Sequence, residues 1–295
     1  MSKILKWIES GTQKPATLWL FEKALLLWLL VHAVYHLPLR NLFWGVNSLF
    51  KVSNSSEGFI MNLYYMLCYN KGLATWVFAI HIVAIVWSLI GRYSWISKPF
   101  IYLTGYMLYY SAYYTFNSGF LLCILWVFFL IPLRVNSNKP NAGVINNLVL
   151  VACMIQFLLV YSVAGMTKWT GTDWLEGSGL YYALHLEHYS PDWVRETFLG
   201  STILLMILNY GALLYQSIFP LLIWIKRIKA PLLVVGCLFH LGIAVMLNLW
   251  DFGMAMIVGY TLFLDEKWVV GVLRCLPKKL LGKTGLKQSL KVAPQ

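Results

Sequence analysis

The stretch that decides the fold, Asn146 to Glu176, reads NNLVLVACMIQFLLVYSVAGM followed by TKWTGTDWLE. Its first part, Asn146 to Met166, has the length of about 20 apolar residues that a helix needs to cross a bilayer. The second part brings Lys168 to the edge of that bilayer. An ionisable group there is retained where a cavity, a partner or a path to the headgroups accommodates it. Lys168 therefore either reaches for the headgroups beside Trp169 and Trp174 or belongs to a site.

Composition extends this interpretation to the whole chain. Of the 295 residues, 60% are hydrophobic and only 12% are charged, and the mean hydropathy is +0.68. These values exclude an ordinary soluble domain. A helix satisfies its own backbone hydrogen bonds in lipid, so the sequence predicts an all-α integral membrane protein with several spans.

Repeated apolar runs predict a bundle of about eight transmembrane helices in a single domain, residues 1–295. The expected spans are Thr17 to Leu37, Leu73 to Gly91, Pro99 to Phe116, a fourth ending near Leu133, Asn146 to Met166, Ser201 to Ile225, Ala230 to Leu249 and Phe252 to Leu264. The last is only marginally long enough to cross. An interfacial helix is expected at Phe59 to Tyr69, and a short helix containing Trp193 is expected to begin at Ser190, Pro191 and Asp192.

The distribution of the charged residues behind the net charge of +12 indicates how these spans are oriented. If both termini are cytoplasmic, most of the 23 lysine and arginine residues fall on the inner side, including those of a basic tail, residues 265–295. The outer segments are then slightly acidic, and the Lys168 loop faces outward. The basic residues thus set the orientation of the protein in the membrane and attract anionic lipids. They give no support for nucleic-acid binding. The first apolar run is too long for a signal-peptide core, so we expect a retained span.

The most informative group of residues is Tyr161, Gly165 and Lys168, which share one helix face because they are spaced four and three residues apart. If this face points into the bundle, Lys168 lies in a partly dry pocket, where a lysine becomes able to act as a base near neutral pH. Asp173 and Glu176 then orient the lysine or pair with it. Interfacial anchoring of Lys168 remains the alternative.

His240 is a second polar group, near the middle of an expected span. Asn248 and Asp251 follow toward the outer face, so a relay along the helix is one hypothesis and an interhelical hydrogen bond is the other. The five cysteines form no CxxC pair and predict no disulfide framework. Five residues expected at the outer interface are of types that bind transition metals: His32, His36, His185, Glu187 and His188. Because such side chains are also ordinary at membrane interfaces, we expect no metal site.

The 14 tryptophans and 18 tyrosines favour interface belts and core packing, with a flat pocket for a quinone or a lipid as the alternative. The chain has no GxGxxG, P-loop, GxSxG or CxxCH motif. Nucleotide binding, serine hydrolysis and c-type haem attachment therefore have no support from motifs.

Two stretches resemble a known family. The run Tyr161 to Leu180 resembles the transmembrane domain shared by vitamin K-dependent gamma-glutamyl carboxylase and its bacterial relatives, the horizontally transferred transmembrane domain (HTTM) proteins. The matching residues are Tyr161, Ala164, Gly165, Lys168, Asp173, Trp174, Glu176 and Gly177. A second run is similar to the family's penultimate hairpin, with Phe239, His240, Asn248, Phe252, Gly253 and Met254.

The resemblance implies that Lys168 is the base that deprotonates a hydroquinone on the extracytoplasmic side. It also implies a family Asn-His pair before a membrane helix, of which Asn117 is kept while Ser118 replaces the histidine. The large lumenal propeptide-binding domain has no counterpart in this sequence. Both departures count against glutamate carboxylation itself, and the resemblance implies a carboxylase-like or quinol-dependent membrane enzyme. Short relatives in the family include a membrane factor that matures a secreted bacterial toxin peptide together with a small partner protein.

These observations lead to three hypotheses. In the first, the protein is an enzyme or maturation factor in the bacterial inner membrane that acts on an exported peptide or a membrane quinol. Its catalytic residues are Lys168 and His240, and its substrate-binding residues are Tyr161, Asp173, Trp174, Glu176 and Asn117. Membrane lipids and a small membrane or extracytoplasmic protein are the expected partners. In the second, the protein is a non-catalytic subunit or anchor of a larger membrane complex; a quinone-reactive electron-transfer subunit is a third, weaker idea.

Overall fold

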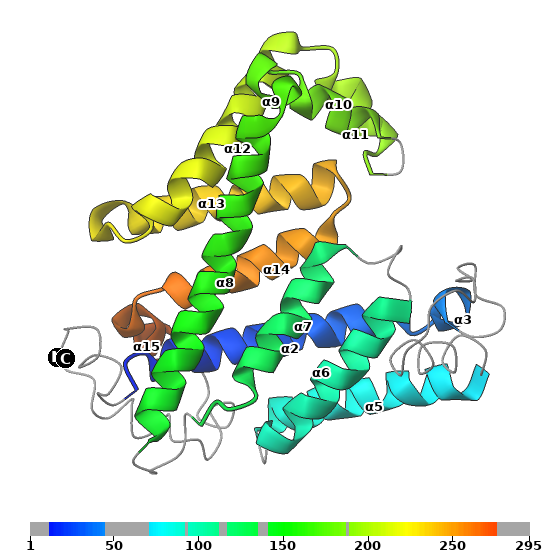
Figure 1. The fold of residues 1–295 in the computed structure, drawn as a ribbon, viewed down its shortest axis with the longest axis vertical. Coiled ribbons are helices and arrows are strands. Elements are labelled where there is room, and N and C mark those ends of the chain that lie inside the picture. Colours follow the sequence, from blue (N-terminus) through cyan, green and yellow to red (C-terminus); the bar gives the residue numbers. More distant parts are fainter. Residues whose placement is uncertain are drawn as a thin grey trace. The chain divides into compact units, whose positions relative to one another are not determined.

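The computed structural model describes residues 12–44, 71–91, 94–111, 117–134, 141–186 and 189–275, and every regular element within these ranges is a helix (Figure 1). The chain forms two compact units. Unit 1 comprises Met1–Ala152 and Leu264–Gln295, and unit 2 comprises Cys153–Phe263. The long helix α8 (Ala142–Thr170) contributes its first part to unit 1 and its remainder to unit 2.

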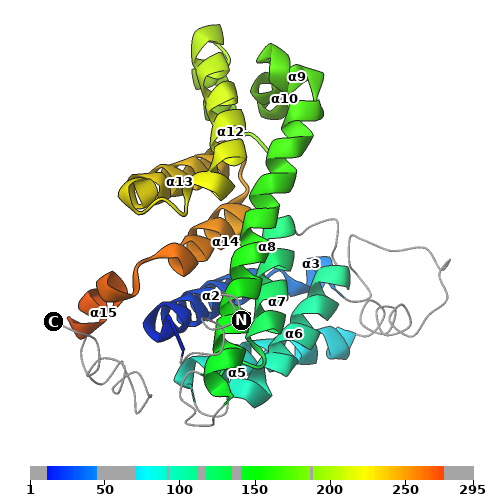
Figure 2. The same cartoon turned by 60° about the vertical axis from the view of Figure 1, so that its left-hand side comes forward.

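Unit 1 is built on a group of neighbouring helices. Helices α5 (Lys71–Ile90), α6 (Ser94–Ser111) and α7 (Ser118–Leu130) lie side by side in both ribbon views (Figures 1 and 2). Helix α2 (Pro15–His36) packs against α5 and α7, and the short α3 (Arg40–Phe43) contacts α5. The amphipathic α15 (Glu266–Arg274) buries Val269, Val270 and Leu273 against the start of α2.

Unit 2 contains the rest of α8, three short helices and a helical hairpin. The short helices are α9 (Thr172–Glu176), α10 (Gly179–His185) and α11 (Asp192–Phe198), followed by the long α12 (Thr202–Leu222). Helices α13 (Lys226–Met246) and α14 (Trp250–Tyr260) run antiparallel, because Gly236 faces Tyr260 while Ala244 faces Gly253. A 3₁₀ turn, η1 (Thr261–Phe263), ends the unit.

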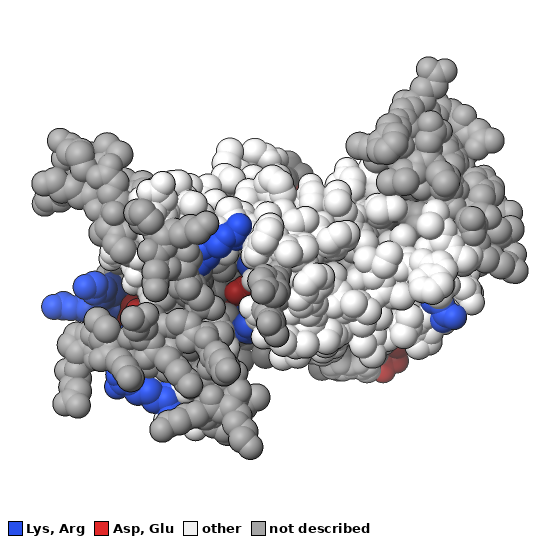
Figure 3. Space-filling model, turned by 90° about the horizontal axis from the view of Figure 1, so that it is seen from below, with Lys and Arg blue, Asp and Glu red and all other residues white. Residues whose placement is uncertain are grey.

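Within the described part of the chain, five helices are long and apolar enough to cross a membrane: Pro15–His36, Gly72–Ile90, Ala142–Thr170, Thr202–Leu222 and Lys226–Met246. Apolar side chains on these helices, such as Val83, Val163 and Leu221, are more than half exposed, as expected of lipid-facing surfaces. Described side chains on the face drawn in Figure 3 are mostly uncharged. The described structure therefore confirms the all-α fold and contains several candidate membrane-spanning helices.

Helix boundaries differ from the predicted ones by a few residues at several ends, and the difference beside Lys168 bears on the site. Helix α8 continues to Thr170, so Lys168 lies in its last turn and not in the loop expected from Thr167 onward. That expected loop contains three short helices, and the predicted helix with Trp193 is confirmed as α11, whose N-cap is Pro191. Each of these helices is at most seven residues long, which is too short for a hydrophobic period to reveal. The interfacial helix expected at Phe59 to Tyr69 lies outside the described residues.

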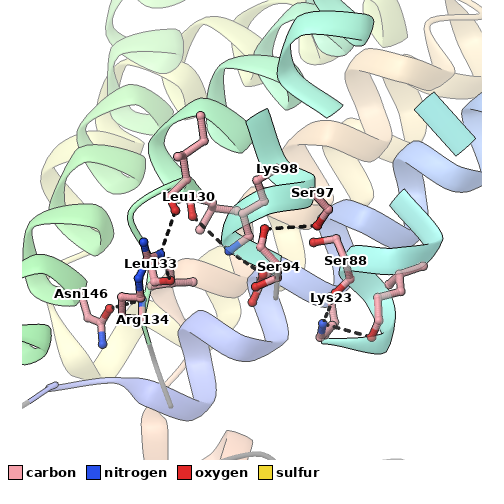
Figure 4. A network of polar contacts seen from close by, with 12 residues as sticks. Lys23, Ser88, Ser94, Ser97, Lys98, Leu130, Leu133, Arg134 and Asn146 are labelled. Atoms are coloured by element: carbon pink, nitrogen blue, oxygen red, sulfur yellow. Dashed lines mark hydrogen bonds and ion pairs between the residues drawn. The ribbon is translucent and has the colours of Figure 1, made fainter. Parts of the chain in front are cut away.

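One end of unit 1 is organised by basic side chains that bind helix C-termini (Figure 4). The last carbonyls of a helix have no partner within that helix. Lys23 Nζ donates to the carbonyls of Ser88 and Leu89 at the end of α5, at 2.9 and 3.2 Å. Lys98 Nζ donates to the carbonyl of Leu130 at the end of α7, at 3.0 Å.

The same end of unit 1 holds two carboxylates in defined positions. Glu22 Oε1 lies 2.7 Å from Lys98 Nζ, and both side chains are buried. The carboxylate of Glu266 accepts hydrogen bonds from the backbone N–H groups of Ala16 and Thr17, at 2.7 and 2.9 Å. It thereby caps the N-terminus of α2, where a negative charge is favourable.

Candidate functional site

The face of α8 singled out in the sequence carries Tyr161, Gly165 and Lys168, and the structure places all three in unit 2. Tyr161 is buried, Gly165 packs against Ser217 of α12, and Lys168 is half-buried. A Cβ at Gly165 would lie 3.3 Å from the Ser217 hydroxyl oxygen, so the missing side chain allows α8 and α12 to approach closely. Spacing along one helix was sufficient to predict this shared face.

Lys168 meets an aromatic ring where the chain turns from α8 into α9. Its Nζ lies 4.6 Å from the centroid of the Trp174 ring, within the range of a cation–π interaction. Asp173 and Glu176, the expected orienting carboxylates, are exposed. Within the described chain neither of them forms an ion pair with Lys168. In the described chain, the Lys168 ammonium therefore contacts the ring of Trp174 and not a carboxylate.

Trp174 is itself held by residues that sequence reasoning did not assign to the site. A Cβ at Gly179 would lie 2.6 Å from Cδ2 of the indole, so only glycine leaves room for the ring. Asn209 of α12 is buried; its Nδ2 donates to the carbonyl of Trp174 at 2.8 Å, and its Oδ1 accepts from the N–H of Leu180 at 3.1 Å. One amide thus fixes α9 and α10 to α12. An asparagine inside an apolar span was the available signal for this role.

A chain of buried polar side chains lies deeper in unit 2. His240 Nε2 is 2.7 Å from the hydroxyl of Tyr161, which also contacts the hydroxyl of Tyr260. Tyr260 is 3.0 Å from the hydroxyl of Tyr215, and Tyr215 donates to the carbonyl of Leu232 at 3.0 Å. The interhelical hydrogen bond that the sequence left open for His240 is therefore present. Tyr215 and Tyr260 were not predicted, because three tyrosines on three helices share no sequence pattern.

Aromatic rings enclose this polar chain. Phe219 stacks on Tyr161 with ring centroids 4.3 Å apart, and Phe239 and Phe252 lie 5.0 and 5.6 Å from the His240 ring. Gly236 of α13 is the point of closest approach, because a Cβ there would overlap the hydroxyls of Tyr215 and Tyr260. The result is a polar chain in an apolar, water-poor surrounding, where hydrogen bonds are electrostatically stronger than in water.

Other predicted residues do not join this chain. Asn117 belongs to unit 1, where its side-chain oxygen accepts from the N–H of Gly119 at 2.9 Å and caps α7. Asn248 occupies the turn between α13 and α14 with φ +51, a left-handed conformation that asparagine tolerates better than most residues. Asp251 lies in the first turn of α14.

The histidines considered as metal ligands are distributed over both units. His32 and His36 lie on α2 in unit 1, and His185 ends α10 in unit 2. Glu187 and His188 fall outside the described residues. Among the residues that are described, no group of three or more His, Cys, Asp or Glu side chains could hold a metal ion.

Comparison with known proteins identifies the family to which this site belongs. The model of the HTTM domain matches residues 113–268, which is just over half of the chain. The chain belongs to the HTTM family. The matched segment includes Lys168, Trp174 and the whole His240 chain, and it confirms the resemblance seen in the sequence. Searches of curated proteins and of solved structures find no match to this HTTM protein.

Proposed function

We propose that this HTTM protein modifies or matures an exported peptide or protein, or acts on a membrane quinol, at the outer face of the bacterial inner membrane with Lys168 as base. The observation that carries the proposal is the setting of Lys168, half-buried over Trp174 with no carboxylate paired to it in the described chain. Release of its proton therefore breaks no ion pair. A base positioned in this way contributes about 10²–10⁴-fold to a reaction rate.

The surroundings of Lys168 support a substrate with an apolar, flat part. Tyr161 lies two helical turns below Lys168 on the same face of α8, a rise of about 10 Å. The aromatic rings around Tyr161 and His240 suit a ring system such as that of a quinol, which binds by burial with a few polar contacts. The exposed Asp173 and Glu176 suit polar contacts with a peptide at the mouth of this site.

Substitution of Lys168 tests the base role. We expect Lys168→Ala to abolish the function while membrane expression stays normal. Lys168→Arg separates the two hypotheses, because arginine keeps a cation over Trp174 but does not deprotonate at working pH. The readout is the phenotype of a strain lacking the gene and complemented by each variant. Full complementation by Lys168→Ala would remove the base hypothesis.

The alternative function, a non-catalytic subunit or anchor, is favoured by the same cation–π contact, since Lys168 and Trp174 together resemble an interfacial anchor. Under this alternative Lys168→Arg complements fully. Purification of the tagged protein in mild detergent, with mass spectrometry of bound proteins and extracted lipids, provides a second test. A stoichiometric protein partner without a small molecule supports the subunit, whereas a retained quinone supports chemistry at Lys168.

We propose further that the chain forms one membrane domain with eight spans and both termini in the cytoplasm. The family match extends over parts of both compact units, which favours one domain. Beyond the five long apolar helices, α6, α7 and α14 with η1 are candidates for the remaining three spans. In this topology the lysines that cap helix ends in unit 1 follow the positive-inside rule.

Cysteine labelling tests this topology. In a variant whose native cysteines are replaced by serine, we expect Thr172→Cys to react with a membrane-impermeant maleimide in intact spheroplasts. Arg227→Cys, also exposed, should react only after the membrane is permeabilised. Labelling of the two positions from the same side, or with their order reversed, would contradict the proposed orientation.

A further inference from the structure

Helix α15 is held against the first turn of α2 by polar groups. The carboxylate of Glu266 accepts hydrogen bonds from the N–H groups of Ala16 and Thr17, at 2.7 and 2.9 Å. It also accepts from the Thr17 hydroxyl, at 2.8 Å. Two residues before α15, the carbonyl of Leu264 accepts from Nζ of Lys14 at 2.9 Å, although these residues are 250 apart in the sequence. The beginning of α15 is therefore fixed to the beginning of α2 (Figure 1).

This junction sets the depth of α15 in the membrane. Helix α2 is long and apolar enough to cross a bilayer, and its candidate span begins at Pro15. A helix rises about 1.5 Å per residue, so Ala16 and Thr17 lie within about 3 Å of the start of that span. Because Glu266 binds these two residues, α15 begins at the level where α2 enters the membrane.

The buried face of α15 keeps the far end of the helix at the same level. One apolar cluster joins α15 to the first two turns of α2: Ala16, Trp19, Leu20, Val269, Val270 and Leu273. Helix α15 has nine residues and is about 14 Å long, so its last turn would lose contact with α2 if the helix pointed away from the membrane. Leu273 belongs to that last turn and remains in the cluster. Helix α15 therefore lies along the membrane surface.

The opposite face of α15 is exposed and has an apolar and a basic flank. Trp268 and Val272 are 57% and 45% exposed, and their spacing of four residues places them on one flank. Lys267 and Arg274 are exposed on the other flank, seven residues apart. This pattern is typical of a helix in the headgroup region, where apolar side chains enter the acyl-chain boundary and basic side chains meet the phosphates.

The charges of this segment match a negatively charged surface. Two acids begin the segment, Asp265 and Glu266, and the carboxylate of Glu266 is bound to the N-terminus of α2. After Arg274 the sequence contains five lysines and no acidic residue up to Gln295. A run of basic residues beside a membrane-spanning helix is attracted to anionic lipids.

We propose that the exposed face of α15 binds anionic phospholipid headgroups in the leaflet where α2 begins. Trp268 and Val272 enter the acyl-chain boundary of that leaflet, and Lys267 and Arg274 bind lipid phosphates. The inference is independent of the function proposed for Lys168, because it uses only residues of unit 1.

Nitroxide labels on the two flanks test this placement. The full chain, with its native cysteines replaced by serine, carries Val272→Cys or Lys267→Cys in nanodiscs of phosphatidylcholine and phosphatidylglycerol in equal parts. We expect the label replacing Val272 to collide mainly with oxygen, which dissolves in acyl chains, and the label replacing Lys267 to collide mainly with a water-soluble nickel complex. If the nickel complex reaches both labels, the face lies in water; if neither reagent reaches the label replacing Val272, a protein covers it. Either result would overturn the proposal.

The charge of the lipid provides a second test. In nanodiscs of phosphatidylcholine alone, or at high salt, we expect the label replacing Val272 to shift toward water, because the attraction of basic residues to phosphatidylglycerol is lost or screened. Val83→Cys is the control, since Val83 is 63% exposed on α5 and a label there should meet oxygen in both lipid mixtures. The same reading from the label replacing Val272 in both mixtures would overturn the role of anionic lipid.

Neutralisation of the basic flank separates α15 from the lysines that follow it. In the Val272→Cys background, Lys267→Gln with Arg274→Gln should reduce the response to phosphatidylglycerol. An undiminished response would assign lipid binding to the lysines beyond Arg274 and overturn the role of α15.

Discussion

The hydroxyl oxygen of Tyr161 lies 2.7 Å from Nε2 of His240, which joins α8 to α13 in the interior of unit 2. Loss of this hydroxyl leaves the buried Nε2 of His240 unpaired, and an unsatisfied buried polar group costs about 1–3 kcal/mol. We expect Tyr161→Phe to lower the free energy of unfolding by that amount, measured by denaturant unfolding in detergent. Tyr182→Phe is the control, because Tyr182 is 55% exposed. Equal stability of the two variants would mean that the Tyr161 hydroxyl does not bind His240.

Gly236 and Gly242 form a matched pair on α13. A Cβ at Gly236 would overlap the hydroxyls of Tyr215 and Tyr260, whereas a Cβ at Gly242 would meet nothing within 4 Å. Gly236→Ala should therefore destabilise the protein by about 1–3 kcal/mol through overpacking. Gly242→Ala should be neutral or stabilising by up to about 1 kcal/mol, because alanine is the better helix former. Thermal unfolding of the two variants compares them directly, and a more stable Gly236→Ala variant would contradict this packing.

The buried ion pair between Glu22 and Lys98 in unit 1 should be costly to break from one side. Glu22→Gln leaves a buried ammonium without its counter-ion, and we expect a loss of about 3–5 kcal/mol. The double variant Glu22→Leu with Lys98→Met removes both charges and should recover most of this loss. The remaining deficit is the uncapped carbonyl of Leu130, worth about 1 kcal/mol.

A double-mutant cycle of Glu22→Leu, Lys98→Met and their double variant, measured by unfolding in detergent, gives this coupling. Lys267→Met is the control for removal of a lysine, since Lys267 is exposed on α15. An effect of Glu22→Gln as small as that of Lys267→Met would show that the pair at 2.7 Å contributes nothing to stability.

The ring of Trp174 should shield the amine of Lys168 from reagents in water. Gly179→Ala places a Cβ 2.6 Å from the indole and forces the ring to move. We expect the rate of Lys168 acylation by a water-soluble amine reagent to rise several-fold in this variant and in Trp174→Ala, measured by peptide mass spectrometry. Gly200→Ala, where a Cβ would meet nothing within 4 Å, should leave the rate unchanged. An unchanged rate in Trp174→Ala would show that the ring does not cover Lys168.

Part of the candidate site could be predicted because its residues lie on one helix. The spacing of Tyr161, Gly165 and Lys168 places them on one face whatever the rest of the chain does. The partner of Lys168 could not be chosen in this way, because the sequence left open both a position beside the tryptophans and a pairing with Asp173 or Glu176. The choice of Trp174 depends on the turn at Gly171 and on the space left by Gly179, which are set by packing against α12.

The sequence by itself determined the fold class and the environment of this protein. Apolar runs about 20 residues long must become helices in lipid, since no water is present to pair with their backbone groups. Only the tertiary structure decided which polar groups meet. Tyr161, Tyr215, His240 and Tyr260 come from four helices separated along the chain, and their hydrogen bonds form because Gly236 lets the hydroxyls approach the α13 backbone. Such contacts depend on the packing of side chains between helices, which hydrophobic periodicity does not encode.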